Sequence, residues 1–110
     1  MPDPQPEFTA AMFNIYRRAL QDEHYPANYF REMLEERFGY ETAMQLIHDT
    51  HPSSGYTALW KRKRLDLTVE ALILRPQWYE LFTDDDRLAA YQRLHEYEFQ
   101  FPPDSWHPPA

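Results

Sequence analysis

Cysteine is absent from the 110 residues of this chain, and glycine occurs only twice. Without cysteine the chain forms no disulfide, binds no metal through a thiolate and has no thiol nucleophile. A loop that holds a phosphate group needs several glycines close together, whereas Gly39 and Gly55 are isolated. The sequence therefore predicts no nucleotide site, and we predict no cofactor.

Long apolar runs are also absent. No segment approaches the roughly 18 consecutive apolar residues that a membrane-spanning helix requires, so we predict no membrane partner. The opening residues MPDPQPEF are acidic and rich in proline, unlike the cationic and then apolar start of a secretion signal. These features predict a cytoplasmic protein. The net charge of −7 disfavours nonspecific binding to nucleic acid, which depends on neutralising phosphate groups.

Apolar residues recur at the spacing of an α-helix through most of the chain. Three internal prolines lie between the apolar segments, where helices end, and the other prolines lie near the two ends of the chain. The pattern predicts a compact all-α domain over residues 7–100, made of five or six short helices, with extended or mobile tails at 1–6 and 101–110. The expected helices cover residues 8–20, 28–39, 40–49, 55–64, 67–75 and 83–99.

Single residues predict where some of these helices begin and end. Gly39 stands where a left-handed residue would close the second helix. Asp66 is expected to be the N-cap of the helix over 67–75, and Thr83 the N-cap of the last helix, whose first turn contains three aspartates. The stretch LTVEALIL is apolar nearly all round, so we expect it at the centre of the fold.

Two groups of polar residues raise the question of catalysis. His48 and His51 are three positions apart, with acidic residues nearby, but no recognised metal-ligand motif includes them, and a polar helix end is the simpler interpretation. Glu70 is the only acid in its apolar segment and could act as a general acid or base if buried. The basic residues at 61–64 are close enough to pair with it, and no second catalytic group is evident. We predict that the protein is not an enzyme and binds no metal.

The chain is acidic, yet four of its eleven basic residues are consecutive. With two aromatic residues just before them they form the first candidate binding segment: Tyr56, Trp60, Lys61, Arg62, Lys63 and Arg64. The arrangement loosely resembles a helix-turn-helix, although its basic residues follow the helix, whereas recognition helices read bases from their N-terminal end. The alternative is that the cations oppose the negative end of a helix dipole and neutralise acidic neighbours such as Asp66 and Glu70.

Aromatic residues make up 16% of the chain, and aromatic side chains with arginine concentrate at protein interfaces. Trp106, in DSWHPP, has few apolar neighbours in the sequence, so it either packs back on the domain or contacts a partner. We predict a non-enzymatic protein-binding or adaptor module. One alternative is a nucleic-acid-binding domain that uses residues 56–64. Another is a small acidic inhibitor of a host or phage complex, which the stretches TDDD and EMLEER would favour.

Three segments carry a family resemblance. Residues 54–60 read SGYTALW, residues 64–72 read RLDLTVEAL and residues 78–83 read WYELFT. This pattern resembles a family of small uncharacterised bacterial helical proteins, and the resemblance covers about residues 8–99. It implies a compact helical module without an assigned activity. The chain departs from the family pattern in its extra basic residues at 61–63 and in its proline-rich C-terminal tail.

Overall fold

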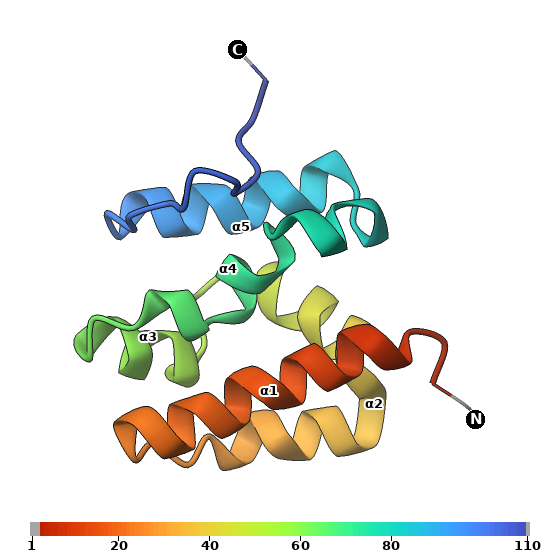
Figure 1. The fold of residues 1–110 in the computed structure, drawn as a ribbon, viewed down its shortest axis with the longest axis vertical. Helices are drawn as coiled ribbons and strands as arrows, with labels where there is room; N and C mark the ends of the chain where they lie inside the picture. The colour runs from red at the N-terminus through yellow and green to blue at the C-terminus, as the bar shows by residue number, and fades with distance from the viewer. Residues whose placement is uncertain (1–2, 110) are drawn as a thin grey trace.

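The computed structural model describes residues 3–109, and every regular element in that range is helical (Figure 1). The prediction of an all-α fold is confirmed. None of these helices combines the length and the apolar surface that crossing a lipid bilayer requires. In chain order the elements are the helices α1 (Pro6–Glu23), α2 (Asn28–Ile47) and α3 (Ser54–Lys61), the 3₁₀ turn η1 (Leu65–Leu67), the short helix α4 (Val69–Ile73), the 3₁₀ segment η2 (Pro76–Leu81) and the helix α5 (Asp84–Glu96).

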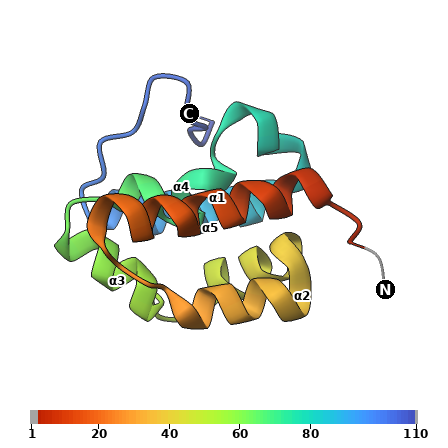
Figure 2. The same ribbon diagram turned by 60° about the horizontal axis from the view of Figure 1, so that its bottom comes forward.

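The helices are arranged around α4. Helices α1 and α2 run antiparallel and side by side along one edge of the molecule, and α5 lies along the opposite edge (Figures 1 and 2). The short helix α4 lies between them and contacts α1, α2 and α5. The expectation that LTVEALIL occupies the centre of the fold is therefore confirmed.

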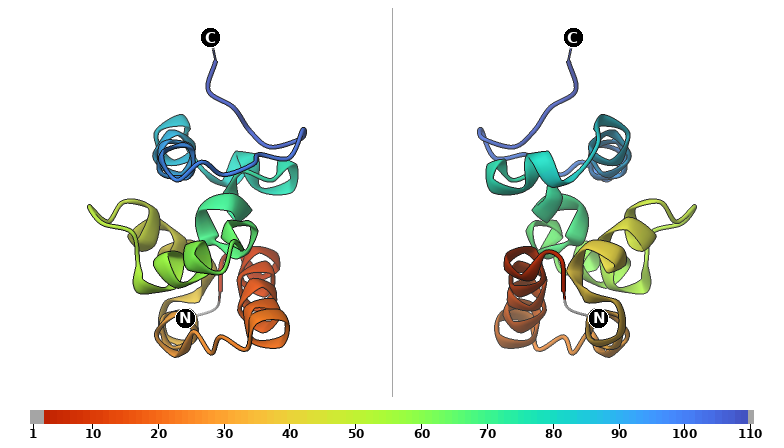
Figure 3. Two further views of the ribbon diagram at one scale, coloured as in Figure 1. Left: turned by 90° about the vertical axis from the view of Figure 1, so that its left-hand side faces the viewer. Right: turned by 90° about the vertical axis from the view of Figure 1, so that its right-hand side faces the viewer.

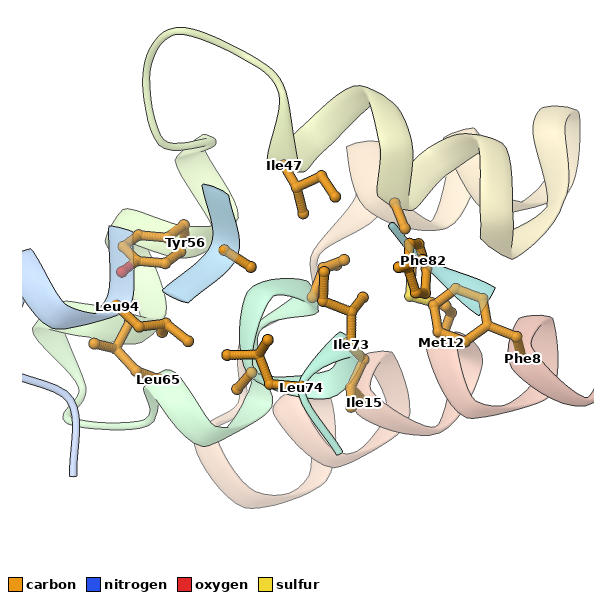
Figure 4. Close-up of a cluster of buried hydrophobic side chains, with 14 of the residues drawn as sticks. Phe8, Met12, Ile15, Ile47, Tyr56, Leu65, Ile73, Leu74, Phe82 and Leu94 are labelled. Atoms are coloured by element: carbon orange, nitrogen blue, oxygen red, sulfur yellow. The ribbon is translucent and has the colours of Figure 1, made fainter. Parts of the chain in front are cut away.

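The core is built from apolar side chains of all these layers (Figure 4). Near one end of α1 the Phe8 ring meets the edges of two other aromatic rings, those of Trp78 and Phe82, each with a centroid separation of 5.3 Å. Fully burying one large apolar side chain contributes roughly 1.5–3 kcal/mol. The side chains with no exposed surface include Phe8, Met12, Leu34, Ile73, Leu74 and Leu94.

Helix α2 contains a kink at Phe38, the residue before the glycine that we expected to end the helix. The positive φ of 63° belongs to Phe38, whereas Gly39 has a negative φ, so the predicted left-handed role of Gly39 is wrong. Gly39 is needed for close packing instead. Its N–H donates a hydrogen bond of 2.9 Å to Oγ1 of Thr9 in α1, and a Cβ atom at position 39 would lie 2.8 Å from the Thr9 Cα. The glycine thus allows the backbones of α1 and α2 to touch.

Of the two N-caps predicted from the sequence, the structure confirms one and contradicts the other. Thr83 caps α5 as predicted: its hydroxyl accepts from the N–H of Asp86, and the Asp86 carboxylate accepts from the N–H of Thr83. The prediction that Asp66 caps the central helix is wrong. Thr68 is the N-cap of α4, because its hydroxyl accepts from the N–H of Ala71, whereas Asp66 lies in η1.

The last residues run without helix back across the domain (Figures 1 and 3). Asp104 accepts two hydrogen bonds of 2.9 Å from the guanidinium of Arg75. The backbone N–H of Trp106 donates to the Leu74 carbonyl at 2.9 Å, and its ring meets the edge of Tyr91. Of the two arrangements expected for Trp106, the structure shows the one packed on the domain, so residues 101–107 cover part of the core.

The two glycines provide a matched test of this packing. We expect Gly39→Ala to lower the free energy of unfolding by about 1–3 kcal/mol, because the new methyl group meets backbone atoms that cannot easily move. At Gly55, an added Cβ has as its nearest neighbours Ser53 Oγ at 3.8 Å and Tyr25 Oη at 3.9 Å, which are ordinary contacts. Gly55→Ala should therefore keep or slightly raise stability. Urea unfolding followed by circular dichroism measures both, and equal stabilities would contradict the close-packing role of Gly39.

Candidate protein-docking site

Large apolar side chains are exposed where three helix ends meet. Within residues 3–109 those with the largest exposed fractions are Tyr29 at 65%, Trp60 at 44% and Leu20 at 40%. They belong to the first turn of α2, the end of α3 and the last turns of α1. These helix ends gather at one end of the molecule, on the left in Figure 1.

An apolar cavity of about 80 Å³ lies at this end, among α1, α2, α3 and the start of α4. It opens at the surface, since three of its lining residues, Asn28, Tyr29 and Ser54, are exposed. Glu70 lies at its inner side and is fully buried. We call this cavity the apolar pocket; the side chains that define it are mainly aromatic or aliphatic, namely Tyr16, Tyr25, Tyr29, Phe30, Met33 and Leu59.

Small residues leave the space that forms the apolar pocket. Ala19, Ala27 and Gly55 all line it, one from each of α1, the α1–α2 connection and α3. Helix α1 ends at His24, whose left-handed backbone turns the chain sharply, so that Tyr25 follows as one wall. The pocket is therefore a consequence of side-chain size at the three positions where the helix ends approach one another.

Neither aromatic residue of the predicted binding segment is exposed in the apolar pocket: Tyr56 lines the pocket but is buried, and Trp60 is not a lining residue. Tyr56 is only 2% exposed and packs among Leu65 and Leu94 in the core (Figure 4), with its hydroxyl donating to the Arg93 carbonyl at 3.2 Å. Burial raises the pKa of Tyr56. Trp60 is exposed, but its ring packs on the edge of Tyr97 beyond the end of α5. The two aromatic side chains therefore do not form one exposed stacking surface with the pocket.

The four residues of the basic segment, 61–64, differ in their contacts: Arg64 forms ion pairs and the other three do not. Arg64 is engaged by three carboxylates, those of Asp22, Glu23 and Asp66, at 3.0–3.4 Å, and these hydrogen bonds, that of Asp66 foremost, raise its pKa further. The predicted neutralisation of Asp66 is thus confirmed. In contrast, Lys61, Arg62 and Lys63 are exposed, and none of them takes part in an ion pair within residues 3–109.

Arg62 has two contacts at the C-terminal end of α3. Its guanidinium donates to the Ala58 carbonyl at 3.0 Å, which satisfies one of the free carbonyl groups at the negative end of the helix. The same guanidinium lies 4.9 Å from the centre of the Tyr25 ring, within the range of a cation–π contact. Because Tyr25 lines the apolar pocket, Arg62 lies at the pocket's edge.

The buried Glu70 is paired with a residue far away in the sequence. Its Oε2 accepts a hydrogen bond of 2.9 Å from Arg93 in α5, so the expected pairing with residues 61–64 is wrong. Nη1 of Arg93 also donates to the Leu46 carbonyl. Burial raises the pKa of Glu70, and the hydrogen bond from Arg93 opposes that rise.

His48 has a structural partner. Its Nε2 lies 2.6 Å from Oδ1 of Asp86, the residue that completes the N-terminal cap of α5. Burial favours the neutral form of Asp86, but the hydrogen bonds from Thr83 and His48 outweigh it and lower the pKa of Asp86. His51 is exposed. Over residues 3–109 no group of three or more histidine or carboxylate side chains is placed to hold a metal ion.

Comparisons with protein families, with curated proteins and with solved structures found no match. The resemblance to the bacterial helical family described above therefore stays a prediction. We infer function from the geometry of the site. The residues that distinguish this site, Leu20, Tyr25 and Tyr29, are absent from the segment that sequence patterns single out.

Substitutions at Glu70 test the buried ion pair. We expect Glu70→Ala to lower the free energy of unfolding by about 3–5 kcal/mol, because it leaves the Arg93 guanidinium buried without a counter-charge. Glu70→Gln keeps a hydrogen-bond acceptor for Arg93, so it should lower the free energy of unfolding less than Glu70→Ala does. Urea unfolding measures both variants.

The difference in free energy of unfolding between the wild type and Glu70→Gln, followed over pH, tests whether folding raises the pKa of Glu70. The pKa of Glu70 is higher in the folded state than in the unfolded state. Protonation of Glu70 therefore stabilises the fold fully below the pKa of the unfolded state, and this stabilisation is lost as the pH rises through the pKa of the folded state. As the pH falls from neutral to about 5, the free energy of unfolding of the wild type should rise relative to that of Glu70→Gln. Urea unfolding at a series of pH values measures this, and a constant difference would contradict it.

Asp86 should show the opposite dependence on pH. We expect Asp86→Asn to cost about 0.5–2 kcal/mol at neutral pH through the weakened cap. Since the folded state lowers the pKa of Asp86, this difference should shrink as the pH falls through that lowered value. Asp85→Asn is the matched control, because Asp85 carries the same charge in the same turn but is exposed. Equal losses from the two substitutions in thermal unfolding would argue against the cap.

Proposed function

We propose that this chain is a non-enzymatic protein-binding module, and that its docking site is the apolar pocket. One observation carries the proposal: the pocket opens at the same end of the molecule as the exposed side chains of Leu20 and Tyr29. Residues that dominate binding energy at protein interfaces are commonly tyrosine, tryptophan and arginine around a well-packed pocket. Tyr25, Tyr29 and Arg62 provide such a rim.

The size of the pocket supports one anchoring side chain. A closed apolar cavity of about 150 Å³ in another protein accepts benzene. The present pocket, at about 80 Å³, has roughly half that volume. It is suited to an aliphatic side chain such as leucine, isoleucine, valine or methionine. Fully burying one such side chain contributes roughly 1.5–3 kcal/mol, which is enough for an anchor but requires further contacts around it.

The chemistry of the pocket supports binding over catalysis. Glu70, the carboxylate at its inner side, already pairs with Arg93. Tyr56 beside it donates its hydroxyl hydrogen to the Arg93 carbonyl. These two polar groups are thus used in holding the fold, and most of the surface that faces the cavity is apolar. An apolar cavity with an aromatic rim recognises side chains by shape.

Filling the pocket tests this proposal. Gly55 lines the pocket in helical backbone with negative φ, so Gly55→Leu places a side chain in the cavity without backbone strain. Peptides selected from a random displayed library on the wild-type protein would be titrated against each variant by calorimetry. We expect Gly55→Leu to weaken binding at least about tenfold and Gly55→Ala to weaken it far less, because alanine leaves most of the space open.

Unfolding measurements on both variants provide the control for stability. Peptides that bind Gly55→Leu as tightly as the wild type would show that the pocket is not the docking site. A selection that yields no binding peptide would count against a protein-binding function.

A further inference from the structure

We infer that the partner segment is acidic: an aliphatic side chain enters the apolar pocket, and aspartate or glutamate residues beside it contact Lys61, Arg62 and Lys63. This inference rests on the proposed function, because it names the chemistry of the partner for the same pocket. The charges and contacts around the pocket mouth carry it.

The spacing of residues along α3 directs its cationic end toward the pocket. Gly55 and Leu59 both line the pocket and are four positions apart, so they lie on one face of the helix. Arg62, three positions further, continues this face, and its guanidinium lies over the Tyr25 ring that forms a pocket wall. The pocket mouth and Arg62 are therefore parts of one surface, and Lys61 and Lys63 are its neighbours in the chain.

The cations beside the pocket are available to a partner. The acidic side chains nearby, Asp22, Glu23 and Asp66, are all engaged by Arg64. Arg64 thus offsets part of the charge of these three carboxylates, and the four cations at 61–64 exceed them by one. The exposed cations are those of Lys61, Arg62 and Lys63. Within residues 3–109 none of these three cations pairs with a carboxylate, so they match an anionic surface on the partner.

The first turn of α2, which also lines the pocket, adds no negative charge. It contains no acidic residue, and the N-cap of α2, Ala27, has no side chain to accept a hydrogen bond. The partial positive charge at the start of a long helix adds to the potential of the lysine and arginine side chains. Both sides of the pocket mouth thus favour carboxylates around the anchor.

An acidic peptide fits this surface better than a nucleic acid. The pocket has the size of an aliphatic side chain, and Trp60, the exposed ring that could stack on a base, packs toward Tyr97 on another side of α3. A long polyanion would also be repelled by a chain with a net charge of −7. A short peptide senses mainly the charges within about 8 Å at physiological ionic strength, where the cations prevail.

Two variants with equal loss of charge test the inference. The first is Lys61→Gln/Arg62→Gln/Lys63→Gln, which removes the cations beside the pocket. The matched control neutralises three exposed arginines that do not line the pocket, two in α1 and one in α2: Arg17→Gln/Arg18→Gln/Arg37→Gln. The probes are pocket-binding peptides from the random library, defined by their loss of affinity for Gly55→Leu, and versions of them with Asn and Gln in place of Asp and Glu.

We expect the selected peptides to be enriched in aspartate and glutamate next to an aliphatic residue. Their affinity should fall at least about tenfold with the first variant and change by less than about twofold with the control. Raising the salt concentration should weaken binding to the wild type, and the Asn and Gln versions should bind weakly to every variant.

The failures of the two proposals are distinguishable. Peptides that lose affinity for Gly55→Leu but are not acidic, and are unaffected by removal of the cations, would overturn this inference and leave the docking function intact. Peptides insensitive to Gly55→Leu would overturn the docking function itself. A fluorescent single-stranded oligonucleotide that binds the wild type and Gly55→Leu equally, but not the variant without the cations, would assign this surface to nucleic acid and overturn the inference.

Discussion

The arrangement of the helices depends on Arg93. From α5 its guanidinium binds the carboxylate of Glu70 in α4 and the carbonyl of Leu46 near the end of α2, and its own carbonyl accepts from the hydroxyl of Tyr56 in α3. One residue thus joins four helices by directional bonds in an environment with little water. Apolar packing alone would tolerate small shifts of these helices past one another, whereas a buried guanidinium with several fixed acceptors does not.

This constraint explains why the apolar pocket has defined walls. Tyr56 and Glu70, which line its inner side, are both bonded to Arg93, so α3 and α4 are fixed relative to each other. Near the other end of α1 from the pocket, α1 and α2 are held in contact by the hydrogen bond between Thr9 and Gly39. The small residues at the helix ends then leave a space that no neighbouring side chain fills. A preformed cavity of this kind loses little conformational entropy when a partner binds.

The sequence predicts local features of this fold well and the contacts between distant segments poorly. The all-α class, the central position of LTVEALIL and the Thr83 cap depend on periodicity or on neighbouring residues. Asp66 and Thr68 are both good N-caps, and only the 3₁₀ turn before α4 selects Thr68. Sequence patterns do not predict the pairing of Glu70 with Arg93, because this pairing depends on how α4 and α5 pack. The apolar pocket is harder still to predict from the sequence, since it is formed by small side chains on three separate segments.

The covering of the core by residues 101–107 has a consequence for folding during synthesis. Phe82 packs on Phe8, Leu94 lies in the core, and Trp106 bonds to the carbonyl of Leu74. Phe8 in α1 and Leu74 at the end of α4 therefore depend on partners that come much later in the sequence. While the polypeptide emerges from a ribosome, α1 and α2 can pair as a hairpin, but their inner faces stay exposed to water until α4, α5 and residues 101–107 have been synthesised. Closure of the core is thus a late event that engages nearly the whole chain at once.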